Sequence, residues 1–267
     1  MVKLCFMHRP RPSRFERYVA LGDSSTEGID DPDGLGGFRG WSQRLAERIA
    51  KGQGGGGLQY ANLAVRGLTT AEIREQQLAP ALAMRPDLAT LFCGTNDVIR
   101  WRFDAGSVAA DIERMQRALV DSGATVLSFT LPDLTPVMPI ARFIAPRIAA
   151  LNRALADASR STGSILVDFA AHPVATDSRL WSEDRIHANS DGHARIAEAL
   201  ADALGLPGSD ASWSHAFPKQ LERTRLKHFA EELRWLGRHL LPWLWEGLVQ
   251  SSSENGRRPK RPNLGPV

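Results

Sequence analysis

The chain is poor in the residues that would cross-link it or anchor it in a membrane. Its 267 residues include two cysteines, Cys5 and Cys93, which are too few for a disulfide framework. Unpaired cysteines are typical of a reducing compartment, so we expect free thiols and a cytoplasmic protein. No apolar run is long enough to span a bilayer, and the basic and proline residues at 8–12 interrupt the N-terminal apolar run, which leaves no secretory signal.

The sequence also lacks the spacings of several classes of binding site. No His/Cys group has zinc spacing, and the acidic run Asp30, Asp31 and Asp33 lacks the closing Glu of a calcium loop. Residues 52–57 match the glycine pattern of a dinucleotide site, but a helix pattern precedes them and a strand pattern follows, which is the reverse of the required order. We therefore expect a flexible linker at residues 52–57. For the protein as a whole, we expect neither a bound metal nor a cofactor.

The positive charge of the chain is confined to its two ends. Residues 1–17 hold five Lys or Arg and one Glu, and residues 206–267 hold ten Lys or Arg and six Asp or Glu. Because the whole chain carries +3, residues 18–205 carry a net charge of −5. An acidic body repels a phosphate backbone, so we expect no nucleic-acid partner and surface contacts made by the basic ends.

Strand and helix patterns alternate between residues 18 and 204. The strands are expected at 18–21, 58–64, 88–93, 125–130 and 165–169, and the helices at 38–50, 69–84, 107–120, 141–161 with a break near Pro146, and 190–204. Such alternation implies right-handed crossovers and a mostly parallel sheet. The sequence therefore predicts an α/β fold with a five-stranded sheet, and the pattern leaves the strand order open.

The first predicted strand ends next to a serine that can act as a nucleophile. The apolar run from Tyr18 to Leu21 stops at Gly22-Asp23-Ser24, which is how a buried strand delivers a side chain to the carboxyl edge of a sheet. Alone, Gly-Asp-Ser is also ordinary turn chemistry. Three further blocks accompany it, namely residues 62–67, Gly94-Thr95-Asn96-Asp97 and Asp184-Arg185-Ile186-His187.

These four blocks, in this order and at these separations, resemble the GDSL/SGNH hydrolase family, in which Ser, Gly, Asn and His come from four such segments. Ser25 stands where Leu is usual in the family name, at a position that is not catalytic in the family, so the departure concerns substrate preference. The resemblance covers residues 18 to about 204. It implies a single flavodoxin-like, three-layer α/β/α domain with strand order 2-1-3-4-5.

Ester hydrolysis needs a nucleophile, a base that accepts its proton and a group that orients the base. Ser24 is the candidate nucleophile and His187 the candidate base. Asp184 lies three residues before His187, so one turn can present its carboxylate to the imidazole and set the tautomer. Thr26 occupies the last position of what would be a Gly-x-Ser-x-Gly elbow, which argues against the α/β-hydrolase fold.

The reaction also needs donors for a developing oxyanion. The candidates are the backbone N–H groups of Ser24 and Gly67 and the side-chain amide of Asn96, which follows the third strand and so ends at the same edge as Ser24. Four other polar residues near these blocks are not expected in catalysis. We expect His172 and His193 at a surface or a packed edge, and Asp23 and Asp97 in turn geometry.

We predict an enzyme without cofactors that cleaves acyl esters through an acyl-enzyme on Ser24, its substrates being lipid-like esters or acetylated sugars. Thioesterase or peptidase activity would use the same residues. The alternative from another class is a catalytically silent binding protein on the same fold that works through its basic extension. The presence of Ser24, Asn96, Asp184 and His187 together favours the enzyme. The oligomeric state is left open.

Three segments are expected: a basic N-terminal arm at 1–17, the hydrolase domain at 18–205 and a C-terminal extension at 206–267. The extension holds four of the seven tryptophans and has a helical pattern from Lys219 to Val249. We expect its apolar face to pack on the hydrolase body, as a brace or as a cover near the substrate cleft, and peripheral contact with a membrane is the alternative. Residues 251–267, which are rich in Ser, Pro and Arg or Lys, are predicted to be mobile or to lie over a surface.

Overall fold

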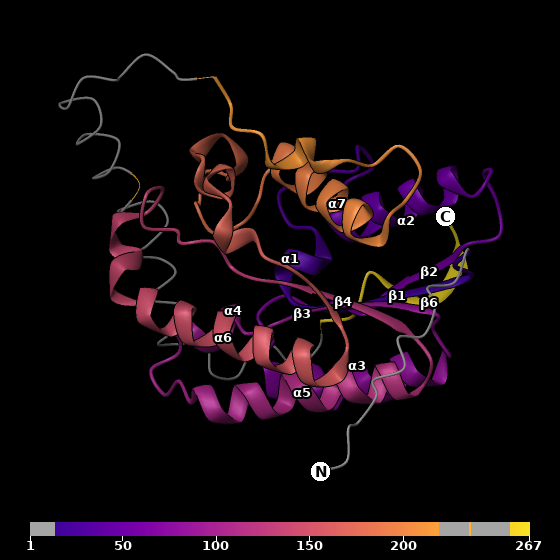
Figure 1. Cartoon of the computed structure of the whole chain (residues 1–267), viewed down its shortest axis with the longest axis horizontal. Helices are drawn as coiled ribbons and strands as arrows, with labels where there is room; N and C mark the ends of the chain where they lie inside the picture. The colour runs from indigo at the N-terminus through magenta and orange to yellow at the C-terminus, as the bar shows by residue number, and fades with distance from the viewer. Residues whose placement is uncertain (1–13, 219–234, 236–256) are drawn as a thin grey trace, which may run out of the picture.

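A six-stranded sheet forms the centre of the protein (Figure 1). The computed structural model describes residues 14–218, 235 and 257–267. The strands lie in the order β5-β4-β3-β1-β2-β6, and the first five pair in parallel while β6 runs antiparallel to β2. Their bounds are β1 Arg17–Gly22, β2 Gln59–Asn62, β3 Leu88–Phe92, β4 Thr125–Phe129, β5 Ile165–Val167 and β6 Arg261–Pro266.

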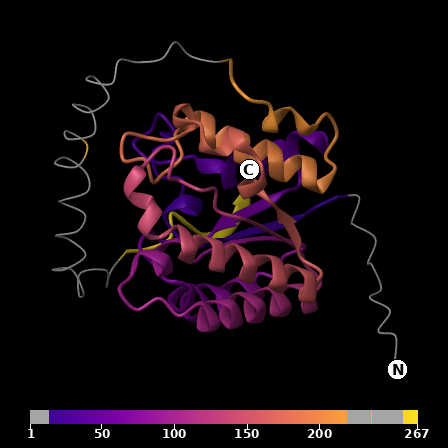
Figure 2. The ribbon, with the colours of Figure 1, turned by 60° about the vertical axis from the view of Figure 1, so that its left-hand side comes forward.

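Helices cover both faces of this sheet, which gives three layers (Figures 1 and 2). One layer contains α1 (Ser24–Glu27), α2 (Gly40–Gly52) and α7 (Ser190–Leu204), and the other contains α3 (Thr70–Ala83), α4 (Thr95–Ile99), α5 (Ala105–Asp121) and α6 (Ala145–Thr162). Short 3₁₀ segments complete the connections: η1 Pro139–Phe143, η2 Phe169–Ala171, η3 Pro173–Thr176, η4 Ser178–Leu180 and η5 Ala211–Ser214.

The central strands are apolar on both faces because both faces are covered. Tyr18, Val19, Ala20 and Leu21 of β1 are fully buried, and β3 is buried along its whole length. The predicted α/β class, the parallel pairing and the order 2-1-3-4-5 are therefore confirmed. The direction of chain progression reverses between β1 and β3, and the carboxyl ends of such a strand pair form the usual crevice for a ligand in this kind of sheet.

The sheet has one strand more than the sequence predicted. Residues 261–266, which were expected to be mobile or to lie over a surface, form a strand that pairs with β2 at Gln59 and Tyr60 at the sheet edge. Their sequence, Arg-Pro-Asn-Leu-Gly-Pro, contains two prolines and no alternation, so it gives no strand signal by itself. An edge strand tolerates proline because only one of its sides needs to pair. A side-chain contact also joins the two strands, since the Arg261 guanidinium lies 5.2 Å from the centre of the Tyr60 ring.

Helix boundaries follow the local signals closely. Both bonds of the capping box between Thr69 and Glu72 are present at the start of α3, as the sequence predicted. The predicted helix at 141–161 is interrupted, since the 3₁₀ segment η1 ends at Phe143 and α6 begins at Ala145. Pro146 then occupies the first turn of α6, where the missing N–H of a proline costs no hydrogen bond.

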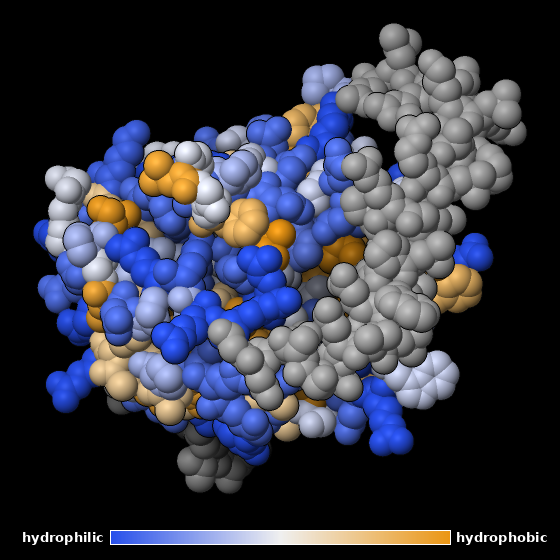
Figure 3. Space-filling model, turned by 180° about the vertical axis from the view of Figure 1, so that it is seen from behind, coloured by the Kyte–Doolittle hydropathy of each residue, from blue (hydrophilic) through white to orange (hydrophobic). Residues whose placement is uncertain are grey.

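Much of the two predicted end segments lies outside the described residues, including Cys5 and nearly all of the helical pattern from Lys219 to Val249. The three-segment division therefore stays a prediction. Trp235 is described, and its buried side chain packs with Leu134, Val137, Met138 and Ala141. Within the described part of the chain, no helix combines the length and apolarity needed to cross a membrane. The face seen in Figure 3 is mostly hydrophilic, with apolar side chains scattered over it.

Candidate active site

Ser24 lies at the end of β1, in the crevice between the carboxyl ends of β1 and β3. It is the first residue of α1, and the Asp23 carboxylate caps this short helix by accepting from the Ser25 N–H at 3.1 Å. Gly22 makes the tight exit from the strand possible, because a Cβ there would lie 2.6 Å from the Phe92 carbonyl oxygen. The sequence thus places Ser24 just beyond the buried part of β1.

Three predicted residues form a hydrogen-bonded chain at this point. His187 Nε2 lies 2.9 Å from Ser24 Oγ, and His187 Nδ1 lies 2.6 Å from Asp184 Oδ2. The second carboxylate oxygen, Asp184 Oδ1, accepts from the backbone N–H groups of Ile186 at 2.9 Å and His187 at 3.0 Å. One Asp side chain therefore holds both the imidazole and the turn that carries it.

The contact between Asp184 and His187 stabilises the ionised form of the Asp184 carboxylate. Burial by itself lowers the pKa of His187, but the hydrogen bond and the attraction from the Asp184 carboxylate outweigh it and raise that pKa above its usual value. Burial by itself raises the pKa of Asp184, and the same contact with His187 holds that pKa far below its usual range. The pair is suited to accept a proton from Ser24, because the carboxylate remains charged while the imidazole gains the proton.

The amide of Asn96 lies between the segments of Ser24 and Gly67. Its Nδ2 donates to the Leu68 carbonyl oxygen at 2.9 Å and to Asp23 Oδ2 at 3.3 Å, so neighbours of both other predicted donors hold it. Gly94 starts the turn that positions it, with φ of 102° and a site where a Cβ would lie 2.5 Å from Leu151 Cδ1. Across the described residues, the backbone N–H groups of Ser24 and Gly67 make no hydrogen bond.

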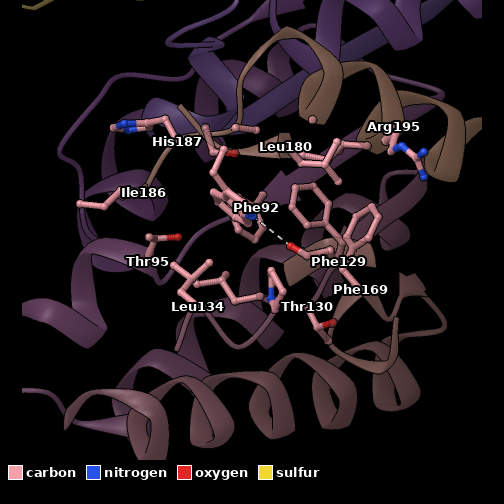
Figure 4. A pocket seen from close by; sticks show the side chains of 18 of the residues that line it. Phe92, Thr95, Phe129, Thr130, Leu134, Phe169, Leu180, Ile186, His187 and Arg195 are labelled. Atoms are coloured by element: carbon pink, nitrogen blue, oxygen red, sulfur yellow. Dashed lines mark hydrogen bonds between the residues drawn. The ribbon is translucent and has the colours of Figure 1, made fainter. Parts of the chain in front are cut away.

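A pocket with a mainly apolar lining opens beside Ser24 and His187 (Figure 4). Its wall is a run of aromatic rings in contact, with centroids 4.0 Å apart for Phe92 and Phe129, 5.4 Å for Phe129 and Phe169, and 5.4 Å for Phe169 and Trp213. In Figure 4 the phenylalanines lie between His187 at one end and Arg195 at the other.

Two polar side chains of this pocket, Thr130 and Arg195, are engaged elsewhere, whereas the buried Thr95 Oγ1 has no hydrogen-bond partner among the described residues. Thr130 Oγ1 donates to Asp168 Oδ1 at 2.7 Å and accepts from the Ala170 N–H at 2.9 Å. Arg195 Nη1 donates to the carbonyl oxygens of Trp213 at 2.6 Å and His215 at 2.9 Å. Because most of its lining residues are apolar, the pocket is suited to a hydrocarbon group.

Comparison with known proteins identifies the family. The model of the GDSL-like lipase/acylhydrolase family matches residues 20–195, which is more than half of the chain. The chain belongs to this family. No curated protein shows significant sequence similarity to it.

Several solved structures share the fold of this chain at low sequence identity. The acetylxylan esterase Axe2 from Geobacillus stearothermophilus has a TM-score of 0.62 at 15% identity, over 78% of this chain and all of Axe2. The lipase Lip_vut3 from a goat rumen metagenome has a TM-score of 0.59 at 20% identity, over 73% of this chain and 99% of the lipase. TesA has a TM-score of 0.58 at 22% identity, over 70% of this chain and 97% of TesA.

Two carboxyl groups near Ser24 of this GDSL family member lie in structural positions. Asp23 is fully buried, and burial raises its pKa to about 7. Burial also raises the pKa of Asp97, whose Oδ2 accepts from the backbone N–H and the hydroxyl of Thr70, both at 2.9 Å. Asp23 therefore ties Asn96 to the first residues of α1, and Asp97 ties α4 to α3.

His193 is buried, which differs from the surface or packed-edge position that the sequence suggested. Its Nδ1 accepts from the Trp41 N–H at 3.1 Å, so it caps the start of α2, and its Nε2 donates to the Ile29 carbonyl oxygen at 2.9 Å. Burial lowers its pKa to about 4, so the ring is neutral at physiological pH. His172 packs against Trp213 with ring centroids 4.6 Å apart.

Sequence reasoning missed the position of Asp30. The sequence placed it in an acidic turn, whereas the structure brings its carboxylate next to His187 and Asp184, with one ligand-type atom of each residue within 4.8 Å of the others. Nothing in the local sequence distinguishes it from Asp31 and Asp33. Asp31 pairs with Arg44, with both N···O distances at 2.7 Å, and Asp33 caps its own loop.

Proposed function

We propose that the protein is a serine hydrolase that cleaves carboxylic esters with a hydrocarbon acyl chain. The observation that carries this proposal is the chain Asp184–His187–Ser24 at the opening of an apolar pocket. Ser24 Oγ attacks the ester carbonyl carbon while its proton passes to His187 Nε2. The imidazolium then protonates the alkoxide leaving group, and the acyl group remains on Ser24 as an ester.

Water completes the cycle at the same residues. His187 Nε2 takes a proton from the water as its oxygen attacks the acyl carbon, and the proton returns to Ser24 Oγ as the carboxylic acid leaves. In both halves of the reaction the carbonyl oxygen becomes an oxyanion. The N–H groups of Ser24 and Gly67 and the amide of Asn96 are the proposed donors to it.

The pocket supports an acyl chain longer than acetyl. Axe2 carries the name of an acetylxylan esterase, whose substrate has a two-carbon acyl group. Here the space beside Ser24 is walled by Phe92, Phe129 and Phe169, and a hydrocarbon chain that entered it would leave water. We infer that the natural substrate is an ester with a medium or long acyl chain, and that a thioester of the same acid is the second candidate.

A series of p-nitrophenyl esters tests the proposal. We expect kcat/KM to rise from acetate to octanoate, because each buried CH₂ contributes about 0.8 kcal/mol, or roughly fourfold, until the pocket is full. Acetate as the best substrate would contradict the acyl-pocket assignment. No turnover of any ester or of the matching acyl thioesters would favour the catalytically silent binding protein instead.

Removal of the Asn96 amide tests the oxyanion site. We expect Asn96→Ala to lower kcat about 10²- to 10³-fold, the scale on which loss of one preorganised donor acts, with little change in KM. Asn96→Asp serves as a second variant, because it keeps the size of the side chain and removes the donor. A change confined to KM would make Asn96 a substrate-binding residue.

A further inference from the structure

Asp30 approaches the imidazole of His187 from a separate segment of the chain. It lies in the loop after α1, whereas Asp184 lies in the same turn as His187. One carboxylate oxygen of Asp30, one of Asp184 and a ring nitrogen of His187 are all within 4.8 Å of one another. In the described residues the Asp30 carboxylate has no hydrogen bond of its own, so it acts on the ring through its charge.

The backbone on both sides of Asp30 is anchored. The Ile29 carbonyl oxygen accepts from buried His193 Nε2 at 2.9 Å. On the other side, Asp31 accepts from the Gly40 N–H at 3.0 Å and from Arg44. Asp30 itself has φ of 67°, a left-handed conformation that a residue with a Cβ adopts rarely. These contacts anchor the segment that brings the Asp30 carboxylate within 4.8 Å of a ring nitrogen of His187.

We propose that Asp30 is a second carboxylate for the base His187, a positioning residue that stabilises the imidazolium as it takes the proton from Ser24. This inference rests on the proposed function, since it assigns Asp30 a part in the same proton transfer. Asp184 fixes the tautomer through a hydrogen bond, and Asp30 adds a negative charge within 4.8 Å without competing for Nδ1 or Nε2. A plain acidic turn, as the sequence suggested, does not explain why the Asp30 carboxylate lies beside His187.

Several charged groups face His187 and set the direction of the effect. Asp184, Asp30 and Asp23 attract its proton, and burial opposes them. Buried His193 also lies within electrostatic range and is neutral at physiological pH. Arg66 faces Asp30 and pairs with Glu27 at 2.5 Å, so it offsets part of the negative charge. Removal of the Asp30 charge should therefore lower the pKa of His187.

The pH profile of kcat/KM for an ester substrate tests this role in the whole protein. Its acid limb reports the base of the free enzyme, so Asp30→Asn should move that limb to lower pH. The plateau should fall about three- to tenfold, because a weaker base accepts the proton less readily. Asp30→Glu should restore much of both, and Asp121→Asn, an exposed acid at the end of α5, should change neither. Superimposed profiles of Asp30→Asn and wild type would overturn the proposal.

A direct titration keeps this test separate from the proposed function. The His187 ring is followed by NMR in the Ser24→Ala protein, with and without Asp30→Asn, and its signal is assigned by its loss in His187→Gln. A lower pKa of His187 without the Asp30 carboxylate supports the proposal, and an unchanged one overturns it, whatever esters the wild type cleaves. If Asp30→Asn does not fold, Asp30→Gly replaces it, because glycine adopts the left-handed conformation without strain.

Discussion

Ser24→Ala is expected to lower kcat for ester cleavage by about 10⁴-fold or more while the protein stays folded. The substitution removes only the attacking oxygen, and its partner His187 Nε2 faces the pocket, where water can replace the hydroxyl. Ser24 is partly exposed, so no cavity forms in the core and stability should change little. Stopped assays with the best p-nitrophenyl ester measure kcat, and thermal melting monitors the fold.

Ser25→Ala is the matched control for this experiment. Ser25 also lines the pocket, and its hydroxyl is one residue from that of Ser24. We expect the control to keep its rate within tenfold of wild type, since in the proposed reaction Ser25 accepts no acyl group. A Ser24→Ala protein that kept a tenth of the wild-type rate would contradict the assignment of Ser24 as the nucleophile.

Asp184→Asn should have the next largest effect, a loss of about 10⁴-fold in kcat with little change in KM. In the wild-type protein the Asp184 carboxylate accepts from His187 Nδ1 at 2.6 Å. The amide of the variant can instead donate to Nδ1. The proton would then sit on Nε2, and the ring could no longer accept a proton from Ser24. The amide oxygen can still accept from the N–H groups of Ile186 and His187, so the turn should keep its shape.

Glu183→Gln gives the matched control, because it removes an exposed negative charge from the neighbouring residue. The double variant Ser24→Ala with Asp184→Asn should be no slower than Ser24→Ala alone, because the two residues act as one unit. Additive losses would indicate that Asp184 supports the site in a way that does not pass through Ser24. A loss confined to KM would likewise contradict the role of Asp184 in orienting the base.

The sequence by itself determined the α/β architecture, because each strand and helix carries its own periodicity. The run Tyr18 to Leu21 is apolar at every position, which indicates a strand covered on both faces. The capping box at Thr69 and the helix at 190–204 also depend on neighbours a few residues away. Asp184 and His187 are three residues apart, so their contact too was predictable from local spacing.

The convergence of Ser24 and Asn96 was predictable for a different reason. Parallel strands end at the same edge of a sheet, so side chains that follow two adjacent strands meet without any knowledge of the packing. The family resemblance added the order of the strands and the pairing of His187 with Ser24. The sequence therefore predicted which residues lie near one another, and the structure supplied the distances between them.

Only the tertiary structure decided the remaining features, because each depends on groups far apart in the chain. Residues 261–266 form a strand because the edge of β2 offers unpaired backbone groups. His193 is buried because α7 packs against the start of α2, which it caps. The pocket arises where rings from three strand ends and Trp213 meet, and Asp30 reaches His187 because its loop is anchored on both sides. Local periodicity carries no information about such contacts, since they are set by how the layers pack.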